Sequence, residues 1–187
     1  RRRLAFCVRI GREYRGTSFL LATGTPYVQL LTQGHAIDYI KLPALEKAPD
    51  GSYQSKLLGL DPEQITKCRK SLLIETARGF LPHLFLVAKA PLGVCTELIP
   101  TLEWLKANRP EVPRIFGMRD IEDEPGITVA RWKRDGVYDA LENLYDQIWV
   151  YGTQATFDVV KQYQLSSRIE SKLTFVGFVG QAGCDHP

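Results

Sequence analysis

Several patterns that identify common enzyme classes are missing from this sequence of 187 residues. It contains neither G-x-G-x-x-G nor G-x-x-x-x-G-K-[ST], so the two most frequent phosphate-binding loops are excluded. Its four cysteines lie far apart and form no C-x-x-C pair, which removes the usual signals of a zinc site or a short disulfide framework. We therefore predict reduced thiols, no metal site and a cytoplasmic location.

Long hydrophobic runs and dense basic clusters are also missing. No apolar stretch approaches the roughly 20 residues that a membrane-spanning helix needs, so only peripheral contact with a membrane stays open. The formal net charge is +3, and Arg1, Arg2 and Arg3 form the only tight basic cluster. Such scattered charge does not indicate a nucleic-acid partner, and we predict none.

Histidine is scarce too, with three residues in the whole chain. His35, His83 and His186 are far apart and have no candidate nucleophile near them in the sequence. A catalytic histidine is therefore not indicated, and His83 reads as structural. Sequence reasoning assigns no catalytic residue.

The apolar residues that are present alternate between short runs and longer amphipathic ones. This alternation is typical of strands joined by crossover helices in a mostly parallel sheet. The predicted strands lie near 17–22, 37–41, 83–88, 114–118, 147–151 and 173–176. We expect one Rossmann-like α/β domain over 1–180 with helices on both faces of the sheet, followed by a tail or linker at 181–187.

Helical periodicity appears in three places between these strands. The segment 62–79 begins with an Asp61–Pro62 start signal, and the segments 94–107 and 126–145 follow the same period. Gly136 is expected to bend or divide the last helix.

Two segments are less clear. The segment 43–60 fits no period, and we predict a long loop there that covers a cleft. The first residues, through Tyr14, fit a strand and a helix equally well.

A run of charged residues marks the most informative position in the chain. Arg119 and Asp120 follow the apolar strand 114–118 directly, and ligands of open α/β sheets gather at such carboxyl ends. Arginine and aspartate there suit hydroxyl or charged groups of a ligand. The alternative is a self-paired turn in which Asp123 caps the next helix, with Glu124 and Pro125 in its first turn.

Three further turns follow predicted strands and are candidate binding positions. Tyr151 and Gly152 end the strand 147–151, and Thr153 is a candidate N-cap of a short helix. Gly24 lies between two threonines after the first strand, and Lys89 follows the third. Each position also fits an ordinary turn, with Lys89 as an exposed surface lysine.

Taken together, several segments resemble the predicted bacterial glycosyltransferases related to family 28, which are similar to the peptidoglycan N-acetylglucosaminyltransferase. The resemblance runs from about residue 1 to residue 179. Its carriers are IKLPAL at 40–45, DGSY at 50–53, LGLD at 58–61, APLG at 90–93, ELIPTLEWLK at 97–106, GMRDIEDEP at 117–125, YDQIWVYG at 145–152 and TFVGFV at 174–179.

The resemblance implies a protein with two facing Rossmann-like domains, of which this chain is similar to the N-terminal, acceptor-side one. Such a protein transfers a sugar from a nucleotide-sugar donor to an acceptor hydroxyl, without a metal or other cofactor. Its partners are that donor, which acts as a co-substrate, the acceptor, and a C-terminal donor-binding domain that is missing here. The resemblance also assigns the first residues to a helix over 2–14.

The chain departs from the family pattern in three ways. The first strand and its glycine-rich G-x-G-H turn are absent, the donor domain is absent, and Ala88 stands where an aspartate is common. We therefore expect the chain by itself to be inactive. Two rival readings remain: a non-catalytic module that binds a sugar or a partner, and an enzyme similar to a nucleotide-sugar epimerase.

Overall fold

The computed structural model describes residues 2–33, 35–49 and 52–178 and divides the chain into two compact units. Among the described residues, unit 1 extends to residue 73 and unit 2 covers residues 74–178. The division falls within one long helix, α3 (Pro62–Phe80). The tail expected at 181–187 lies outside the described residues.

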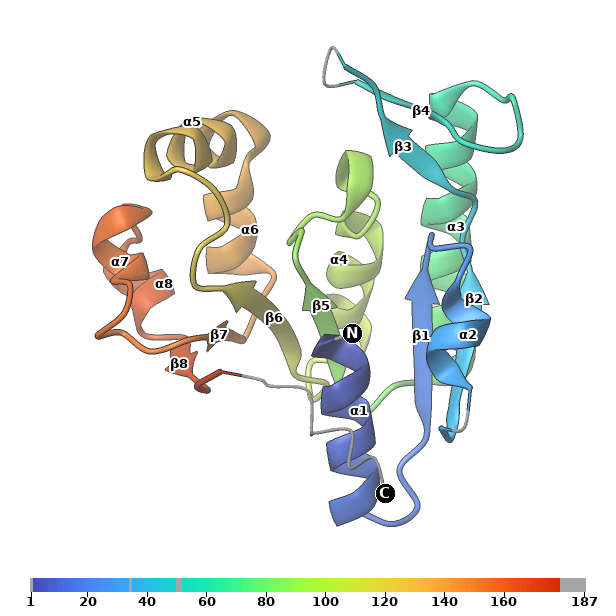
Figure 1. The fold of residues 1–187 in the computed structure, drawn as a ribbon, viewed down its shortest axis with the longest axis horizontal. Coiled ribbons are helices and arrows are strands. Elements are labelled where there is room, and N and C mark those ends of the chain that lie inside the picture. The colour runs from blue at the N-terminus through green and yellow to red at the C-terminus, as the bar shows by residue number, and fades with distance from the viewer. Residues whose placement is uncertain (1, 34, 50–51, 179–187) are drawn as a thin grey trace, which may run out of the picture. The chain divides into compact units, whose positions relative to one another are not determined.

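Unit 1 begins with a helix and contains two small sheets (Figure 1). Helix α1 (Arg2–Glu13) precedes β1 (Phe19–Thr23), α2 (Val28–Thr32) and β2 (Ile37–Lys41). Strands β1 and β2 pair in parallel, with Phe19 opposite Ile37 and Thr23 opposite Lys41. The predicted N-terminal helix and both predicted strands are confirmed, within two residues at their ends.

The predicted loop at 43–60 is wrong in part. The strands β3 (Leu45–Lys47) and β4 (Tyr53–Ser55) form an antiparallel hairpin there. Each has three residues, too few for an alternating pattern to stand out in the sequence. The exposed segment 56–61 leads from this hairpin to α3.

Unit 2 is built around a parallel sheet of four strands in the order β5-β6-β7-β8. The strands are β5 (Phe85–Ala88), β6 (Arg114–Arg119), β7 (Gln147–Tyr151) and β8 (Leu173–Phe175). All four lie at predicted positions and pair in parallel. An α/β fold with a parallel sheet is therefore confirmed. In the part of the chain that the model describes, β1 and β2 form a separate ladder.

Helices occupy every connection between these strands (Figure 1). A short 3₁₀ turn, η1 (Val94–Thr96), and α4 (Ile99–Asn108) follow β5. Helices α5 (Pro125–Asp135) and α6 (Val137–Asn143) follow β6, and α7 (Val159–Gln162) and α8 (Ser167–Glu170) follow β7. Gly136, with a φ of 72°, separates α5 from α6, so the predicted break is confirmed.

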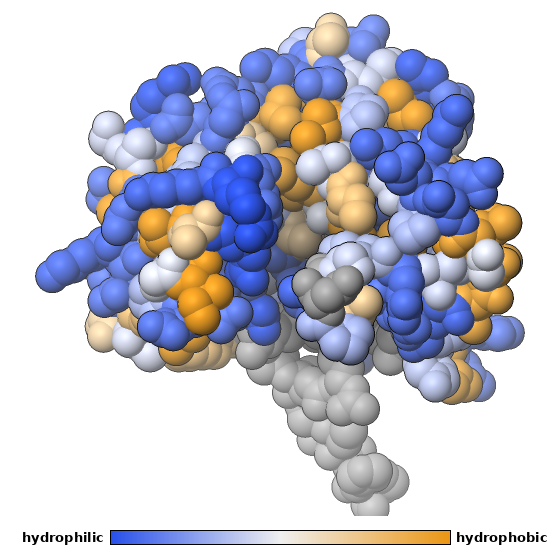
Figure 2. All heavy atoms as spheres, turned by 90° about the horizontal axis from the view of Figure 1, so that it is seen from above, coloured by the Kyte–Doolittle hydropathy of each residue, from blue (hydrophilic) through white to orange (hydrophobic). Residues whose placement is uncertain are grey.

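The core of unit 2 lies along its two central strands. Ile115, Phe116, Met118, Ile148 and Val150 are each 1% exposed or less. Strands covered on both faces are continuously apolar, and β6 and β7 have this property between their polar first residues and their carboxyl ends. Figure 2 shows hydrophilic residues over most of one face of the molecule, with hydrophobic residues in separate small groups.

Two sets of polar contacts lie at the amino ends of strands β6, β7 and β8. The Asp146 carboxylate, just before β7, accepts hydrogen bonds from Nε and Nη2 of Arg114 at 2.9 and 2.6 Å and from the Arg114 amide at 2.8 Å. Lys172, just before β8, donates from Nζ to the carbonyls of Leu141, Glu142 and Tyr145. Lys172 therefore satisfies carbonyls at the end of α6 that the helix leaves unpaired.

Acid should weaken the contact between Arg114 and Asp146. Desolvation raises the pKa of Asp146, but hydrogen bonds and the charge of Arg114 lower it more, so that this pKa lies below its ordinary value. A depressed folded-state pKa stabilises the fold at neutral pH, and this stabilisation is lost as the pH falls below about 4. We expect Asp146→Asn to lower the free energy of unfolding at pH 7 and to reduce its further decrease between about pH 4 and pH 2.

Denaturant unfolding at a series of pH values measures this dependence. The exposed Glu103→Gln on α4 is the control and should leave the stability at pH 7 close to that of the wild type. A profile for Asp146→Asn parallel to that of the wild type would contradict the assignment.

Candidate functional site

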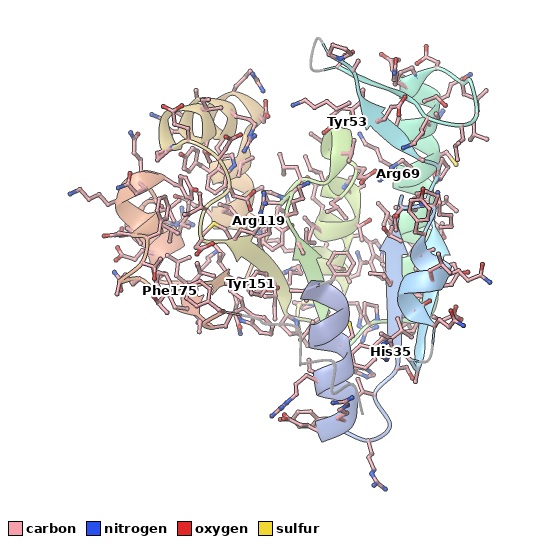
Figure 3. All side chains as sticks on the ribbon, viewed as in Figure 1. His35, Tyr53, Arg69, Arg119, Tyr151 and Phe175 are labelled. Atoms are coloured by element: carbon pink, nitrogen blue, oxygen red, sulfur yellow. The ribbon has the colours of Figure 1, made fainter. Side chains whose placement is uncertain are left out.

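The carboxyl ends of three neighbouring strands in unit 2 bring most of the predicted site residues together. Arg119 and Tyr151 are partners in the β6–β7 ladder, and Figure 3 shows both at this end of the sheet. Lys89 follows β5, and its amide donates to the carbonyl of Gly117 at 3.4 Å. Because Asp120 and Gly152 follow Arg119 and Tyr151 directly, five of the six predicted binding residues share one edge of one sheet.

Two glycines allow β6 and β7 to meet closely at this edge. A Cβ atom added to Gly117 would lie 2.3 Å from the hydroxyl oxygen of Tyr151, and one added to Gly152 would lie 2.7 Å from Cβ of Asp120. Both distances are too short for a real side chain. The Tyr151 side chain therefore covers Gly117, and the Asp120 side chain packs on Gly152.

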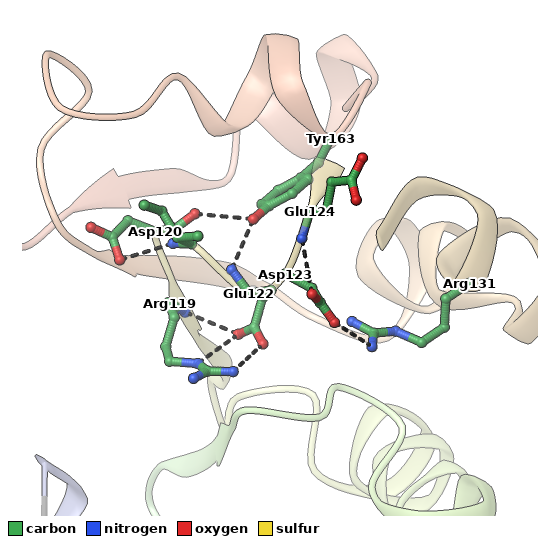
Figure 4. A network of polar contacts seen from close by, with 8 residues as sticks. Arg119, Asp120, Glu122, Asp123, Glu124, Arg131 and Tyr163 are labelled. Atoms are coloured by element: carbon green, nitrogen blue, oxygen red, sulfur yellow. Dashed lines mark hydrogen bonds and ion pairs between the residues drawn. The ribbon is translucent and has the colours of Figure 1, made fainter. Parts of the chain in front are cut away.

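Arg119 already has a charged partner. Its Nη2 donates to Oε2 of Glu122 at 2.8 Å, and its amide donates to Oε1 at 3.3 Å (Figure 4). The Glu122 side chain is only 6% exposed, whereas that of Arg119 is 40% exposed. Hydrogen bonding to Glu122 raises the pKa of Arg119, so the guanidinium enters this site with its charge balanced.

Tyr163 holds the turn that carries these residues. Its hydroxyl accepts from the Glu122 amide at 2.8 Å and donates to the Asp120 carbonyl at 3.3 Å (Figure 4). The ring is fully buried, with ring centroids 5.3 Å from Trp132 and 5.5 Å from Phe157, and desolvation raises the pKa of the phenol. Asp120 is therefore positioned by a residue 43 positions away.

Sequence reasoning named neither Glu122 nor Tyr163 as a site residue, although the alternative of a self-paired turn agrees with the Arg119–Glu122 ion pair. The spacing of three residues between Arg119 and Glu122 within the acidic run was a signal for an ion pair. Tyr163 gave no such signal, because nothing local in the sequence connects α7 with the turn after β6.

The predicted cap of α5 is wrong by one position. Glu124 occupies the N-cap with a ψ of 131° and makes no side-chain cap bond, and Pro125 is the first helical residue. Proline favours an extended residue before it, and this constraint places Glu124 rather than Asp123 at the boundary. Asp123 instead accepts from the Glu124 amide at 3.0 Å and lies 3.8 Å from Arg131.

The predicted cap at Thr153 is also wrong. Thr153 begins a turn in which its carbonyl accepts from the Thr156 amide at 3.0 Å, and the two hydroxyl oxygens lie 2.8 Å apart. Helix α7 starts at Val159, and the side chain of Asp158 caps it by accepting from the Lys161 amide. Aspartate is as good an N-cap as threonine, and its position set the boundary.

The loop after β5 has an unusual backbone. Lys89, Cys95 and Thr96 have φ values of 79°, 50° and 58°, which non-glycine residues rarely adopt. The buried hydroxyl of Tyr145 holds the loop by donating to the Pro91 carbonyl at 2.5 Å. Strained backbone conformations of this kind persist only where neighbouring contacts hold them in place, and they are often found at ligand-binding sites. Lys89 is exposed, which agrees with the alternative prediction that it is a surface lysine in an ordinary turn.

Gly24, the sixth predicted residue, belongs to unit 1. A Cβ atom there would lie 3.0 Å from Nη1 of Arg69, a buried side chain whose Nη1 donates to the Pro43 carbonyl at 2.6 Å. Burial, together with the Arg69 charge, lowers the pKa of nearby Lys41. Gly24, Lys41 and Arg69 therefore lie near one another at the carboxyl ends of β1 and β2.

The structure bears on three further predictions, those about metal sites, membrane-spanning helices and cysteines, but only for the residues that it describes. Residues 2–33, 35–49 and 52–178 contain no group of three or more potential metal ligands. In the same ranges no helix has the length and apolar character needed to cross a membrane. Cys7, Cys68 and Cys95 are free thiols, while Cys184 and His186 lie outside the described residues.

One apolar surface bears on the expected peripheral membrane contact. Leu57, Leu58 and Leu60, in the segment 56–61, are 67%, 56% and 49% exposed. Exposed apolar residues of this kind occur at protein and membrane interfaces alike. Membrane contact therefore stays a prediction.

Comparison with known proteins adds no relative: no family model, no curated protein and no solved structure matches this chain.

The close packing of β6 and β7 predicts the effect of adding one methyl group. Gly117→Ala should lower the free energy of unfolding by about 1–3 kcal/mol, because the new Cβ meets the Tyr151 ring and hydroxyl. Gly126→Ala in α5 is the matched control. A Cβ there has no atom within 4 Å, so it should be neutral or stabilise the helix by roughly 0.5–1 kcal/mol.

Denaturant unfolding of both variants, and of Gly117→Ala combined with Tyr151→Phe, provides the measurement. Removal of the hydroxyl should recover part of the lost stability, which appears as a coupling between the two positions. Additive effects of the two substitutions would contradict the contact.

Proposed function

We propose that this chain is the acceptor-side domain of a glycosyltransferase with two facing Rossmann-like domains, similar to the bacterial enzymes related to family 28. In a longer protein, it would hold the acceptor while a second domain supplies the nucleotide-sugar. One observation carries the proposal. Arg119 and Asp120 of the family-like segment GMRDIEDEP lie together with Tyr151 and Gly152 of the segment YDQIWVYG at the carboxyl edge of a parallel sheet.

That edge has the chemistry that sugar binding needs. The Asp120 carboxylate accepts hydrogen bonds, and one of its oxygens already accepts from the Ile121 amide at 2.9 Å. The Arg119 guanidinium and the Lys89 ammonium supply donors, and both side chains are at least partly exposed. Open α/β sheets bind their ligands at such an edge.

Transfer itself needs more than this edge. The leaving nucleotide diphosphate must be stabilised by helix N-termini or basic groups, and the proposal assigns that role to the donor domain. The chain by itself should therefore bind but not turn over. In this proposal Asp120 orients the acceptor hydroxyl, and Arg119 and Glu122 hold the turn in shape.

The test is an assay of sugar transfer by a longer reading frame that includes this chain, with a panel of nucleotide-sugars and with mass spectrometry of the products. We expect transfer by the longer protein, no transfer by residues 1–187, and at least about a tenfold loss of kcat/KM in Asp120→Asn, since a lost charged hydrogen bond costs about 1.5–3 kcal/mol. Glu124→Gln, an exposed change in the same loop, is the control and should retain activity.

Two results would contradict the proposal. Ordinary turnover by residues 1–187 would show that no donor domain is needed. An epimerised nucleotide-sugar without any transferred sugar would favour the epimerase reading.

A partner-binding module is the second candidate, and one feature of β5 favours it. Among the ladders of the described residues, β5 pairs with β6 alone, and its four residues are all apolar. Apolar edge strands are templates for pairing with another chain. The Phe85 and Lys89 amides face β6, so by alternation the Val87 amide does so too and that of Ala88 faces away.

A pair of proline substitutions separates this candidate from the proposal. Ala88→Pro removes an amide that faces away from β6 and should leave unit 2 folded, whereas Val87→Pro breaks the ladder and should unfold it. We expect sedimentation to show the same association state for the wild type and Ala88→Pro. Wild-type association that Ala88→Pro abolishes would favour the partner-binding module.

A further inference from the structure

The charges at the carboxyl edge of unit 2 restrict which part of an acceptor it can bind. The turn 119–124 carries four carboxylates and one guanidinium. The guanidinium of Arg119 is paired with the nearly buried Glu122, and the more distant Arg131 lies 3.8 Å from Asp123. The turn therefore has an excess of negative charge, and the charge of its only arginine, Arg119, is already balanced by Glu122.

An anion would bind poorly to such a turn. The Glu122 carboxylate already balances the charge of Arg119, so the remaining N–H groups of the guanidinium offer a phosphate little net attraction. A phosphate there would also lie near the carboxylate of Asp120, and like charges repel. Lys89, at the end of the neighbouring strand, is a single exposed lysine and offers only weak compensation.

Uncharged hydroxyl groups meet neither obstacle. Asp120 is fixed on three sides: one oxygen accepts from the Ile121 amide, its side chain packs on Gly152, and its carbonyl accepts from Tyr163. A carboxylate held in this way is a preorganised acceptor for hydroxyl donors, and charge-assisted hydrogen bonds are the stronger ones.

We propose that the carboxyl edge of the unit 2 sheet binds an uncharged polyhydroxyl group through Asp120 and discriminates against phosphate and diphosphate. This inference rests on the proposed function, because it assigns to this edge the sugar ring of the acceptor rather than a phosphate. The Arg119–Glu122 pair is the element that disfavours anions, since the Glu122 carboxylate balances the charge of the guanidinium.

The experiment follows the backbone amides of the full 187-residue chain by NMR while one probe at a time is added. The probes are glucose and N-acetylglucosamine as neutral sugars, and inorganic phosphate and pyrophosphate as anions. With a neutral sugar we expect saturable shifts of the Ile121 and Gly152 amides, and with either anion we expect none. Asp120→Asn should weaken sugar binding at least fivefold, while the control Glu124→Gln should not change it.

Glu122→Gln gives the sharper result. Loss of this carboxylate releases the Arg119 charge, so this variant should gain pyrophosphate binding at the same amides, at least tenfold tighter than the wild type. The dispersion of the amide spectrum shows in each case that the variant is folded. In Glu122→Gln combined with Arg119→Gln, the gained binding should disappear.

Three outcomes would overturn the inference: pyrophosphate binding by the wild type at these amides, sugar binding that Asp120→Asn leaves unchanged, or no binding of any probe. Its failure is distinct from that of the proposed function. Transfer by the longer protein with pyrophosphate on this edge would overturn the inference alone. Sugar binding that depends on Asp120, in a longer protein that transfers nothing, would overturn the function alone.

Discussion

The close approach of β6 and β7 at their carboxyl ends is the constraint on which the candidate site depends. Gly117 and Gly152 have no side chain where one would collide with Tyr151 and Asp120. This packing sets the two strand ends side by side and fixes the direction of the Asp120 carboxylate. Two further contacts stabilise the turn after β6. Tyr163, at the end of α7, forms hydrogen bonds with the backbone of this turn, and Glu122 balances the charge of Arg119.

Stability and the shape of the candidate site are therefore linked through the same few contacts. The contacts of Glu122 and Tyr163 that shape the turn after β6 are polar and part-buried, so the loss of one partner leaves the other poorly satisfied. At the opposite end of the sheet, Arg114 and Asp146 hold the beginnings of β6 and β7 in a similar way. The two central strands are thus held by polar contacts near both ends.

The sequence was sufficient for features that depend on local pattern. Continuous apolar runs located all four strands of unit 2, and Gly136 located the break between α5 and α6. It was insufficient where a boundary depended on competition between neighbours, as at Glu124 and Pro125, and where strands were too short to show a period, as in the hairpin β3–β4. The contact of Tyr163 with the Asp120 turn spans more than 40 residues, and no local pattern contains it.

A crystal structure of the 187-residue chain grown with a neutral disaccharide would test the central claim most directly. The account predicts a sugar ring at the carboxyl edge of the unit 2 sheet, with a ring hydroxyl donating to the Asp120 carboxylate and the Arg119–Glu122 pair intact. A sugar bound away from this edge, or one that has displaced Glu122 from Arg119, would contradict it.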